Sequence, residues 1–162
     1  MTVSSSGPPV VRHRRAAGLI ALLLAAGGST VSGCGTRCTG TTLQVQAVEV
    51  GDTRAPLTVS ARLTRDGRPL AGVQVKLAVN LVGDDNAHTD ALFYADTDAD
   101  GRASVTRREG VAGLSFPNHR VTGYAAYFQP LSPLNGVAYC WSSAGAPITC
   151  RTGDAVGTCP RD

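Results

Sequence analysis

Two segments of this chain alternate apolar and polar residues with a period of two. The first runs from Leu57 to Thr64 and the second from Val73 to Leu81. Successive side chains of a β-strand point to opposite faces, so each segment predicts a strand that buries one face and exposes the other. No stretch of the sequence shows a sustained helical period with capping residues. The alternation therefore favours an all-β fold.

Further segments of the chain also have the composition of strands. One begins with Leu43 and Val45, but its apolar phase shifts at Val48 and Val50. A phase shift within a strand predicts a β-bulge. The others are Leu92–Ala95, Arg102–Arg107, Val121–Phe128 and Gly136–Ser142. The total of about seven strands predicts a β-sandwich.

Two Asp-Gly pairs predict tight turns between these strands. Asp66-Gly67 separates the two alternating segments, and Asp100-Gly101 lies between Ala95 and Arg102. Asp-Gly supplies the positive φ angles that two-residue hairpins favour. We therefore expect a hairpin at each pair.

The segment Val121–Phe128 is apolar on both of its expected faces. Strict alternation puts Val121 and Tyr127 on one face, and Tyr124 and Phe128 on the other. A strand of this kind is either central in its sheet or part of a contact surface. Other aromatic residues of the C-terminal half are Phe116, Tyr139 and Trp141. We expect them in the core, with a binding patch as the alternative if several are exposed.

The excess of positive charge belongs to the N-terminal leader. The chain has 15 basic and 12 acidic residues, and Arg12, Arg14 and Arg15 account for the net charge of +3. An apolar run from Ala16 to Ala26 follows, about half as long as the roughly 20 residues that span a bilayer. This order is typical of an export signal, predicted here for residues 1–33. Because the rest of the chain is formally neutral, we expect no nucleic-acid partner.

The leader ends in Val31-Ser32-Gly33-Cys34, which resembles the bacterial lipobox. In a lipobox the cysteine thiol is acylated, and we predict this for Cys34; the alternative is a plain secreted protein with a free Cys34. We accordingly divide the chain into a signal peptide (1–33), a short tether (34–40) and a sandwich with a disulfide-bonded C-terminal extension (41–162). The expected location is the bacterial cell membrane, with the domain outside the cytoplasm and lipid as its attachment.

The cysteine count supports this reading. Acylation of Cys34 leaves four cysteines, an even number that can form two disulfides outside the cytoplasm. Three pairings are open, and we expect Cys140 with Cys150 across a turn at Ser143-Ala144-Gly145, and Cys38 with Cys159. The chain lacks the Cys-x-x-Cys spacing that is typical of zinc sites.

The residues from Leu57 to Phe128 carry a family resemblance. The motifs are Leu57–Leu63, Asp66–Val75, Thr97–Ala103 and Thr122–Tyr124. Together they look like bacterial immunoglobulin-like (Ig-like) repeats of the invasin type, and they are equally similar to transthyretin-like domains found beside carboxypeptidases. The resemblance implies an extracellular Ig-like module in families used as stalks, spacers and adhesion domains. The chain departs from it in having one copy and a cysteine-bearing C-terminal extension.

Two loops carry candidate metal ligands. Asp96, Asp98, Asp100 and Gly101 match the opening of a calcium loop, but Arg107 occupies the position that needs a bidentate Glu. We therefore expect no metal here, but a turn in which Asp side chains accept from nearby backbone N–H groups; a calcium site completed by another loop is the alternative.

The second candidate is His88 with the loop carboxylates Asp84, Asp85 and Asp90, joined by His119 if its loop lies close. The alternative is a solvated connection. Nucleophile-elbow, zinc-protease and phosphate-loop motifs are missing, so we expect no cofactor and no enzymatic activity. The expected function is a non-catalytic binding or structural role with an envelope protein as partner. The alternative is a metal-binding protein or a small metal-dependent enzyme that uses His88.

Overall fold

The computed structural model describes residues 38–114, 119–152 and 155–159, which belong to one unit of the chain. The predicted signal peptide, Cys34 and Phe116 lie outside these residues. The described strands are β1 (Thr42–Val45), β2 (Val48–Val50), β3 (Leu57–Arg65), β4 (Arg68–Pro69), β5 (Gln74–Gly83), β6 (His88–Asp96), β7 (Arg102–Arg107), β8 (His119–Phe128), β9 (Ser142–Thr152) and β10 (Ala155–Gly157). A short 3₁₀ helix, η1 (Ala112–Leu114), follows β7.

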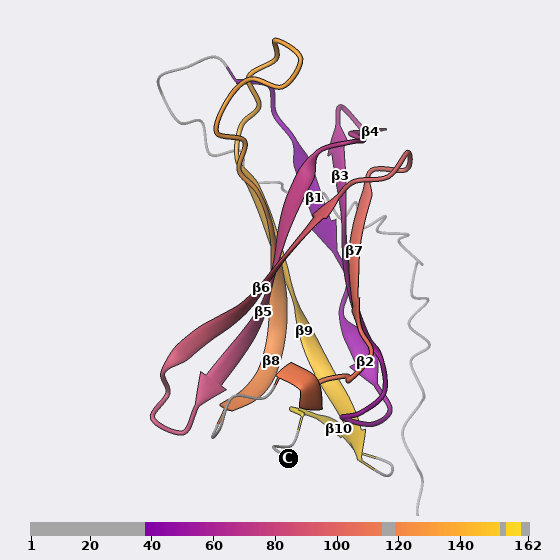
Figure 1. Cartoon of the computed structure of the whole chain (residues 1–162), viewed down its shortest axis with the longest axis vertical. Helices are drawn as coiled ribbons and strands as arrows, with labels where there is room; N and C mark the ends of the chain where they lie inside the picture. The colour runs from indigo at the N-terminus through magenta and orange to yellow at the C-terminus, as the bar shows by residue number, and fades with distance from the viewer. Residues whose placement is uncertain (1–37, 115–118, 153–154, 160–162) are drawn as a thin grey trace, which may run out of the picture. The chain divides into compact units, whose positions relative to one another are not determined.

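The strands form two sheets, which confirms the all-β class (Figure 1). In the four-stranded sheet, β3 pairs antiparallel with β1, β4 and β7. The six-stranded sheet runs β10-β9-β8-β5-β6, and β2 joins β9 in parallel. Buried residues of both sheets form one hydrophobic core, which is the arrangement of a β-sandwich.

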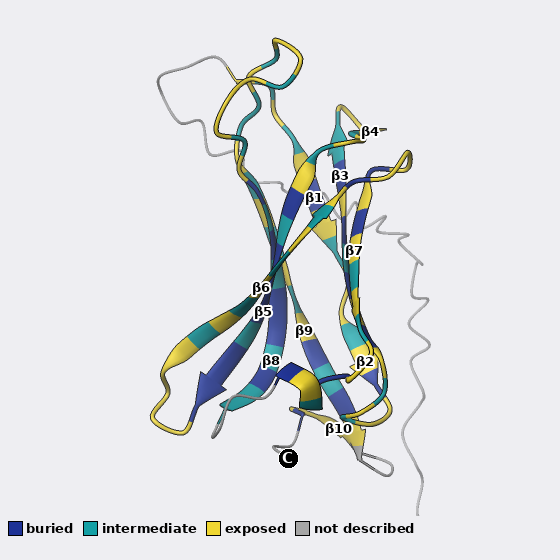
Figure 2. Cartoon of the chain, viewed as in Figure 1, coloured by how far each residue is buried: buried dark blue, intermediate teal, exposed yellow. Residues whose placement is uncertain are grey.

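The two alternating segments form β3 and β5, as predicted. In β3, Leu57, Val59, Ala61 and Leu63 are at most 2% exposed, and their neighbours are more exposed. In β5, four residues from Val75 to Leu81 face the core at 0% exposure. Figure 2 shows the last part of β5 dark throughout, because consecutive residues are buried there. Burial of one face therefore explains the period of two in β3, whereas β5 also buries Ala78 and Val82 on its other face, at 0% and 8% exposure.

The predicted bulge near Val48 is wrong, because the chain changes sheets at this point. Leu43 and Val45 lie on β1, which pairs with β3, whereas Val48 and Val50 lie on β2, which pairs with β9. The two-residue break between β1 and β2 restarts the alternation against a different sheet. A sheet switch and a bulge shift the apolar phase in the same way.

One predicted hairpin forms, with a different partner strand, and the other does not. Asp66 and Gly67 have φ angles of 50° and 75°, as expected, but they join β3 to β4, after which the chain crosses to β5 in the other sheet. Asp100-Gly101 joins β6 to β7, which belong to different sheets. It therefore turns the chain across the sandwich.

The predicted strand Gly136–Ser142 is wrong except at its last residue. Residues 129–141 form a long loop, and β9 begins at Ser142. The predicted turn at Ser143-Ala144-Gly145 lies inside β9, where these residues pair with β8. The small residues that predicted a turn are therefore part of a strand.

Strand β8 is central, between β5 and β9, which accounts for its apolar character on both faces. A register shift opposite Asn80 and Leu81 inserts an extra residue in β8. Val121 therefore faces the core with Tyr124 and Phe128, contrary to the face predicted from strict alternation.

Candidate functional site

The four cysteines after Cys34 form two disulfides, Cys38–Cys140 and Cys150–Cys159, with Cα–Cα distances of 5.0 and 4.6 Å. The expected pairing is therefore wrong, although the number of bridges is right. Cys140 and Cys150 stand at opposite ends of β9, roughly 30 Å apart at about 3.3 Å per residue, too far for a disulfide.

The Cys38–Cys140 bridge fastens the start of the domain to the loop 129–141. Backbone hydrogen bonds support it on both sides, with Thr39 N–H donating to the Ala138 carbonyl at 2.7 Å and Cys140 N–H donating to the Thr39 carbonyl at 2.9 Å. The Thr41 hydroxyl adds a 2.9 Å contact to the Ser142 hydroxyl. The chain therefore enters the domain at a fixed point beside this loop.

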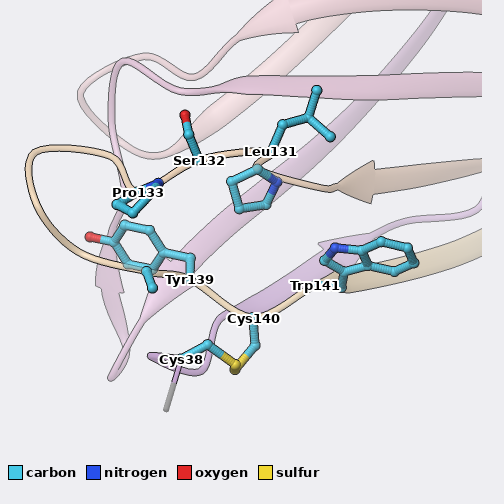
Figure 3. Close-up of a pocket in the computed structure, with 9 residues that line it drawn as sticks. Cys38, Leu131, Ser132, Pro133, Tyr139, Cys140 and Trp141 are labelled. Atoms are coloured by element: carbon cyan, nitrogen blue, oxygen red, sulfur yellow. A yellow bond between two sulfur atoms is a disulfide. The ribbon is translucent and has the colours of Figure 1, made fainter. Parts of the chain in front are cut away.

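A groove of about 350 Å³ lies at this point. We call it the Trp141 groove; its lining includes Cys38, Pro130, Leu131, Tyr139, Cys140 and Trp141. Figure 3 shows Leu131, Ser132 and Pro133 on one arm of the loop, and Tyr139, Cys140 and Trp141 on the returning arm. The Leu131 side chain is 101% exposed and Trp141 is 72% exposed. Large apolar side chains this exposed mark a contact surface when they gather in one place.

Tyr139 anchors the groove to the rest of the domain. Its ring packs edge-on against buried Phe128 at a centroid distance of 6.0 Å. Its hydroxyl oxygen accepts a hydrogen bond of 3.2 Å from Nη1 of Arg65, on β3. The groove therefore has one side chain, Tyr139, that packs on the core, and two exposed apolar side chains, Leu131 and Trp141, at its rim.

A second hollow of about 300 Å³, lined by Tyr127, Gln129, Trp141, Ser142 and Ser143, leads from Trp141 toward the six-stranded sheet. The outward side of that sheet has an apolar and aromatic patch. We call it the outer aromatic face; it consists of Lys76, Leu92, Tyr94, Ala125 and Tyr127, which cover the buried Ala78.

Cross-strand pairing builds this face. Lys76 of β5 lies opposite Tyr94 of β6 and Tyr127 of β8, and Ala78 lies opposite Leu92 and Ala125. The Lys76 ammonium sits 4.4 Å from the centroid of the Tyr127 ring, a cation–π contact. Tyr94 and Leu92 are 59% and 50% exposed. Solvent exposure of Tyr94 and Leu92 follows from alternation along β6, but the sequence does not show which strands flank it.

The geometry of the candidate calcium turn matches the turn interpretation. Oδ1 of Asp98 accepts hydrogen bonds of 2.9 Å from the N–H groups of Asp100 and Arg102. Gly101 has a φ of 72°, and a Cβ there would collide with the carbonyl oxygen of Leu63. The Asp98 carboxylate and the glycine thus shape the crossing between the sheets.

His88 and His119 lie at the same end of the six-stranded sheet but on opposite faces. His88 pairs with Val82 and His119 with Gly83, and Val82 and Gly83 are consecutive residues of β5. Consecutive strand residues point to opposite faces, so the two imidazoles do not converge.

The carboxylates of the same loop make local contacts. Asp85 accepts from the Ala87 N–H and Asp90 from the Asn80 amide, both at 2.9 Å. Within residues 38–114, 119–152 and 155–159, no group of three His, Cys, Asp or Glu side chains is placed to hold a metal ion.

Tyr124 has a structural role that the sequence analysis did not identify. It is 1% exposed, and its hydroxyl lies 2.8 Å from the Gln46 carbonyl and 2.9 Å from the Ser60 carbonyl. Gln46 is in the break between β1 and β2, so Tyr124 of one sheet holds the point where the chain leaves the other. A buried Tyr hydroxyl needs such a partner, but sequence does not say which.

Comparison with known proteins assigns no family to this chain. Over the described part of the chain, no helix is long and apolar enough to cross a membrane. The chain matches no protein-family model and no curated protein.

Proposed function

We propose that this chain is a lipid-anchored, extracytoplasmic Ig-like module with a non-catalytic binding role at a bacterial cell envelope. The observation that carries the proposal is the cysteine pairing. Two disulfides use Cys38, Cys140, Cys150 and Cys159, which favours an oxidising compartment. The fifth cysteine is Cys34, at the end of the lipobox-like segment, where acylation is expected.

The strand order supports the Ig-like assignment. In Ig sandwiches the first, second and fifth strands share one sheet, and the third, sixth and seventh share the other. Here β1, β3 and β7 share the small sheet, and β5, β8 and β9 share the large one. The fourth long strand differs, because β6 pairs with β5 in the large sheet, whereas the fourth strand of a constant-type Ig domain joins the sheet of the first, second and fifth.

The outer aromatic face supports a binding role toward an envelope protein. Tyr is enriched in protein interfaces, and the partly exposed Leu92 and Tyr94 offer apolar area for contact. The polar loop residues support a non-catalytic reading, because Asp85, Asp90 and Asp98 make the local structural hydrogen bonds described above.

Mass spectrometry of the mature protein tests the anchor. We expect an N-terminal Cys34 that carries acyl chains, together with two intact disulfides. Cys34→Ser should move the protein from the membrane fraction to the soluble fraction. An unmodified Cys34, or membrane retention of Cys34→Ser, would overturn the proposal.

Site-specific photo-crosslinking in intact cells tests the binding face. A crosslinker at Leu92 should give a discrete adduct that Tyr94→Asp abolishes. A crosslinker at Thr58, an exposed residue of the four-stranded sheet, is the matched control and should give none. Equal adducts from both positions would count against the outer aromatic face.

A further inference from the structure

We infer that the end of the sandwich with the Trp141 groove rests on the lipid bilayer that holds the acyl chains of Cys34. Leu131 and Trp141 are the contact residues. This inference rests on the proposed lipid anchor, and it adds which end of the domain the membrane meets. The occupant of the groove rim is therefore the headgroup and upper acyl region of a phospholipid leaflet.

The length of the tether carries the first step. Only Gly35, Thr36 and Arg37 separate Cys34 from Cys38. Four residue steps of fully extended chain reach at most about 14 Å. Since the headgroup layer on one side of a bilayer is roughly 5–8 Å deep, Cys38 stays within about 10 Å of the membrane surface.

The Cys38–Cys140 disulfide carries the second step, because it transfers this restraint to the folded domain. Cys140 is covalently bonded to Cys38 and precedes Trp141 in the chain. Leu131 lines the same groove from the opposite arm of the loop (Figure 3). The domain therefore cannot turn this groove far from the lipid without breaking the bridge.

The chemistry of the rim carries the third step. A fully exposed Leu131 and a largely exposed Trp141 are the side chains that a membrane interface accepts, Trp at the headgroup level and Leu below it. Acyl chains bind a membrane more firmly when a second element of the protein also contacts it.

The opposite end of the sandwich has a different character. Strand β9 runs from Ser142 to Thr152, so the Cys150–Cys159 bridge lies roughly 30 Å away. The β5–β6 turn at that end carries exposed Asp84, Asp85 and His88. The tether end also carries the exposed Asp66, Asp98 and Asp100 in the turns after β3 and β6, so the apolar contact is confined to the Trp141 groove and does not extend over the whole end.

The sole tryptophan of the chain provides the test, because its fluorescence reports on Trp141 alone. The acylated full-length mature protein is placed in vesicles of phosphatidylethanolamine and phosphatidylglycerol, with and without brominated acyl chains. We expect a shift of the emission to shorter wavelength, quenching by the brominated lipid, and protection from acrylamide relative to Cys34→Ser protein in solution.

Two variants make the test specific. Leu131→Asp should lose most of the brominated-lipid quenching and regain acrylamide quenching. Val156→Asp is the matched control, an exposed apolar residue of β10 at the far end, and should behave as the parent protein.

Equal acrylamide quenching of vesicle-bound protein and Cys34→Ser protein in solution would overturn the inference. Protection in native membranes without protection in protein-free vesicles would also overturn it, by showing that a protein covers the groove. The mass of the Cys34 peptide from the same sample separates the two proposals. Acylated Cys34 with an accessible Trp141 overturns only the membrane contact, whereas unmodified Cys34 overturns the anchor as well.

Discussion

The two ends of the sandwich each carry one disulfide, and the two bridges differ in burial and in the length of chain they close. At the tether end, Cys38 is exposed, Cys140 is half-buried, and their bridge spans 102 residues. At the far end, Cys150 and Cys159 are 2% and 1% exposed, and their bridge spans nine residues. The first bridge fixes where the chain enters the domain, and the second is part of the core.

Because of this difference, we expect the two disulfides to contribute differently to the free energy of unfolding. A cross-link destabilises the unfolded chain more as the loop it closes grows longer. The tether-end bridge closes the longer loop, so it receives the larger entropic contribution to stability, although its own cysteines are little buried. The far-end bridge gains less from loop closure but contributes its sulfur atoms to the core.

Removal of the tether-end bridge should have the largest effect. We expect Cys38→Ala/Cys140→Ala to lower the free energy of unfolding by about 4–5 kcal/mol, the value for a closed loop of about 100 residues. Urea unfolding in a Cys34→Ser background measures it. A loss no larger than that of the far-end pair would show that loop length does not decide the difference.

Removal of the far-end bridge should cost less. We expect Cys150→Ala/Cys159→Ala to lower the free energy of unfolding by roughly 2–3 kcal/mol, because its loop is short. Amide exchange should become faster in β10, while exchange in β3 should follow only the global loss of stability. Unchanged exchange in β10 would show that the strand is held by its pairing with β9 alone.

Tyr124→Phe tests a non-covalent tie that complements the Cys38–Cys140 bridge. The hydroxyl holds the chain between β1 and β2 through Gln46, while the disulfide holds it before β1. Its removal takes a partner from the part-buried carbonyls of Gln46 and Ser60, so we expect a loss of about 1 kcal/mol. Thermal unfolding measures the loss, with Tyr94→Phe as the exposed control. Equal stability of Tyr124→Phe and the parent would mean that water replaces the hydroxyl.

Local patterns predicted most of the strands, but they missed β9 and did not predict how the strands connect. Leu57–Leu63 and Val75–Leu81 each place alternate residues in the core, and this alternation can be read from the order of residues within one strand. The sheet switch at Val48 and the crossing at Asp100-Gly101 depend on which strand lies opposite. That choice is made by the packing of residues far apart in the chain, which no short window records.

The candidate sites likewise divide into features set by local sequence and features set by long-range packing. Asp98 and Gly101 were recognisable as a turn because their contacts are local. The disulfide pairing and the opposite facing of His88 and His119 required the strand order β6-β5-β8-β9. Prediction of the Trp141 groove would need both local and long-range information. Its loop is a local segment, but Cys38, on its other side, lies about a hundred residues earlier in the chain.

The smallest expected effect concerns the exposed apolar residues at the two ends. Leu131 is fully exposed and Val156 is about half exposed. Because the fully exposed Leu131 side chain is not part of the core, we expect Leu131→Ser to change the free energy of unfolding by less than about 0.5 kcal/mol. Val156→Ser should lower it slightly more, because Val156 is half exposed. Urea unfolding of both variants without the lipid measures this. A loss above about 1 kcal/mol for Leu131→Ser would show that the loop packs on the domain in solution. The contrast between an exposed tether end and a far end whose disulfide is part of the core would then fail.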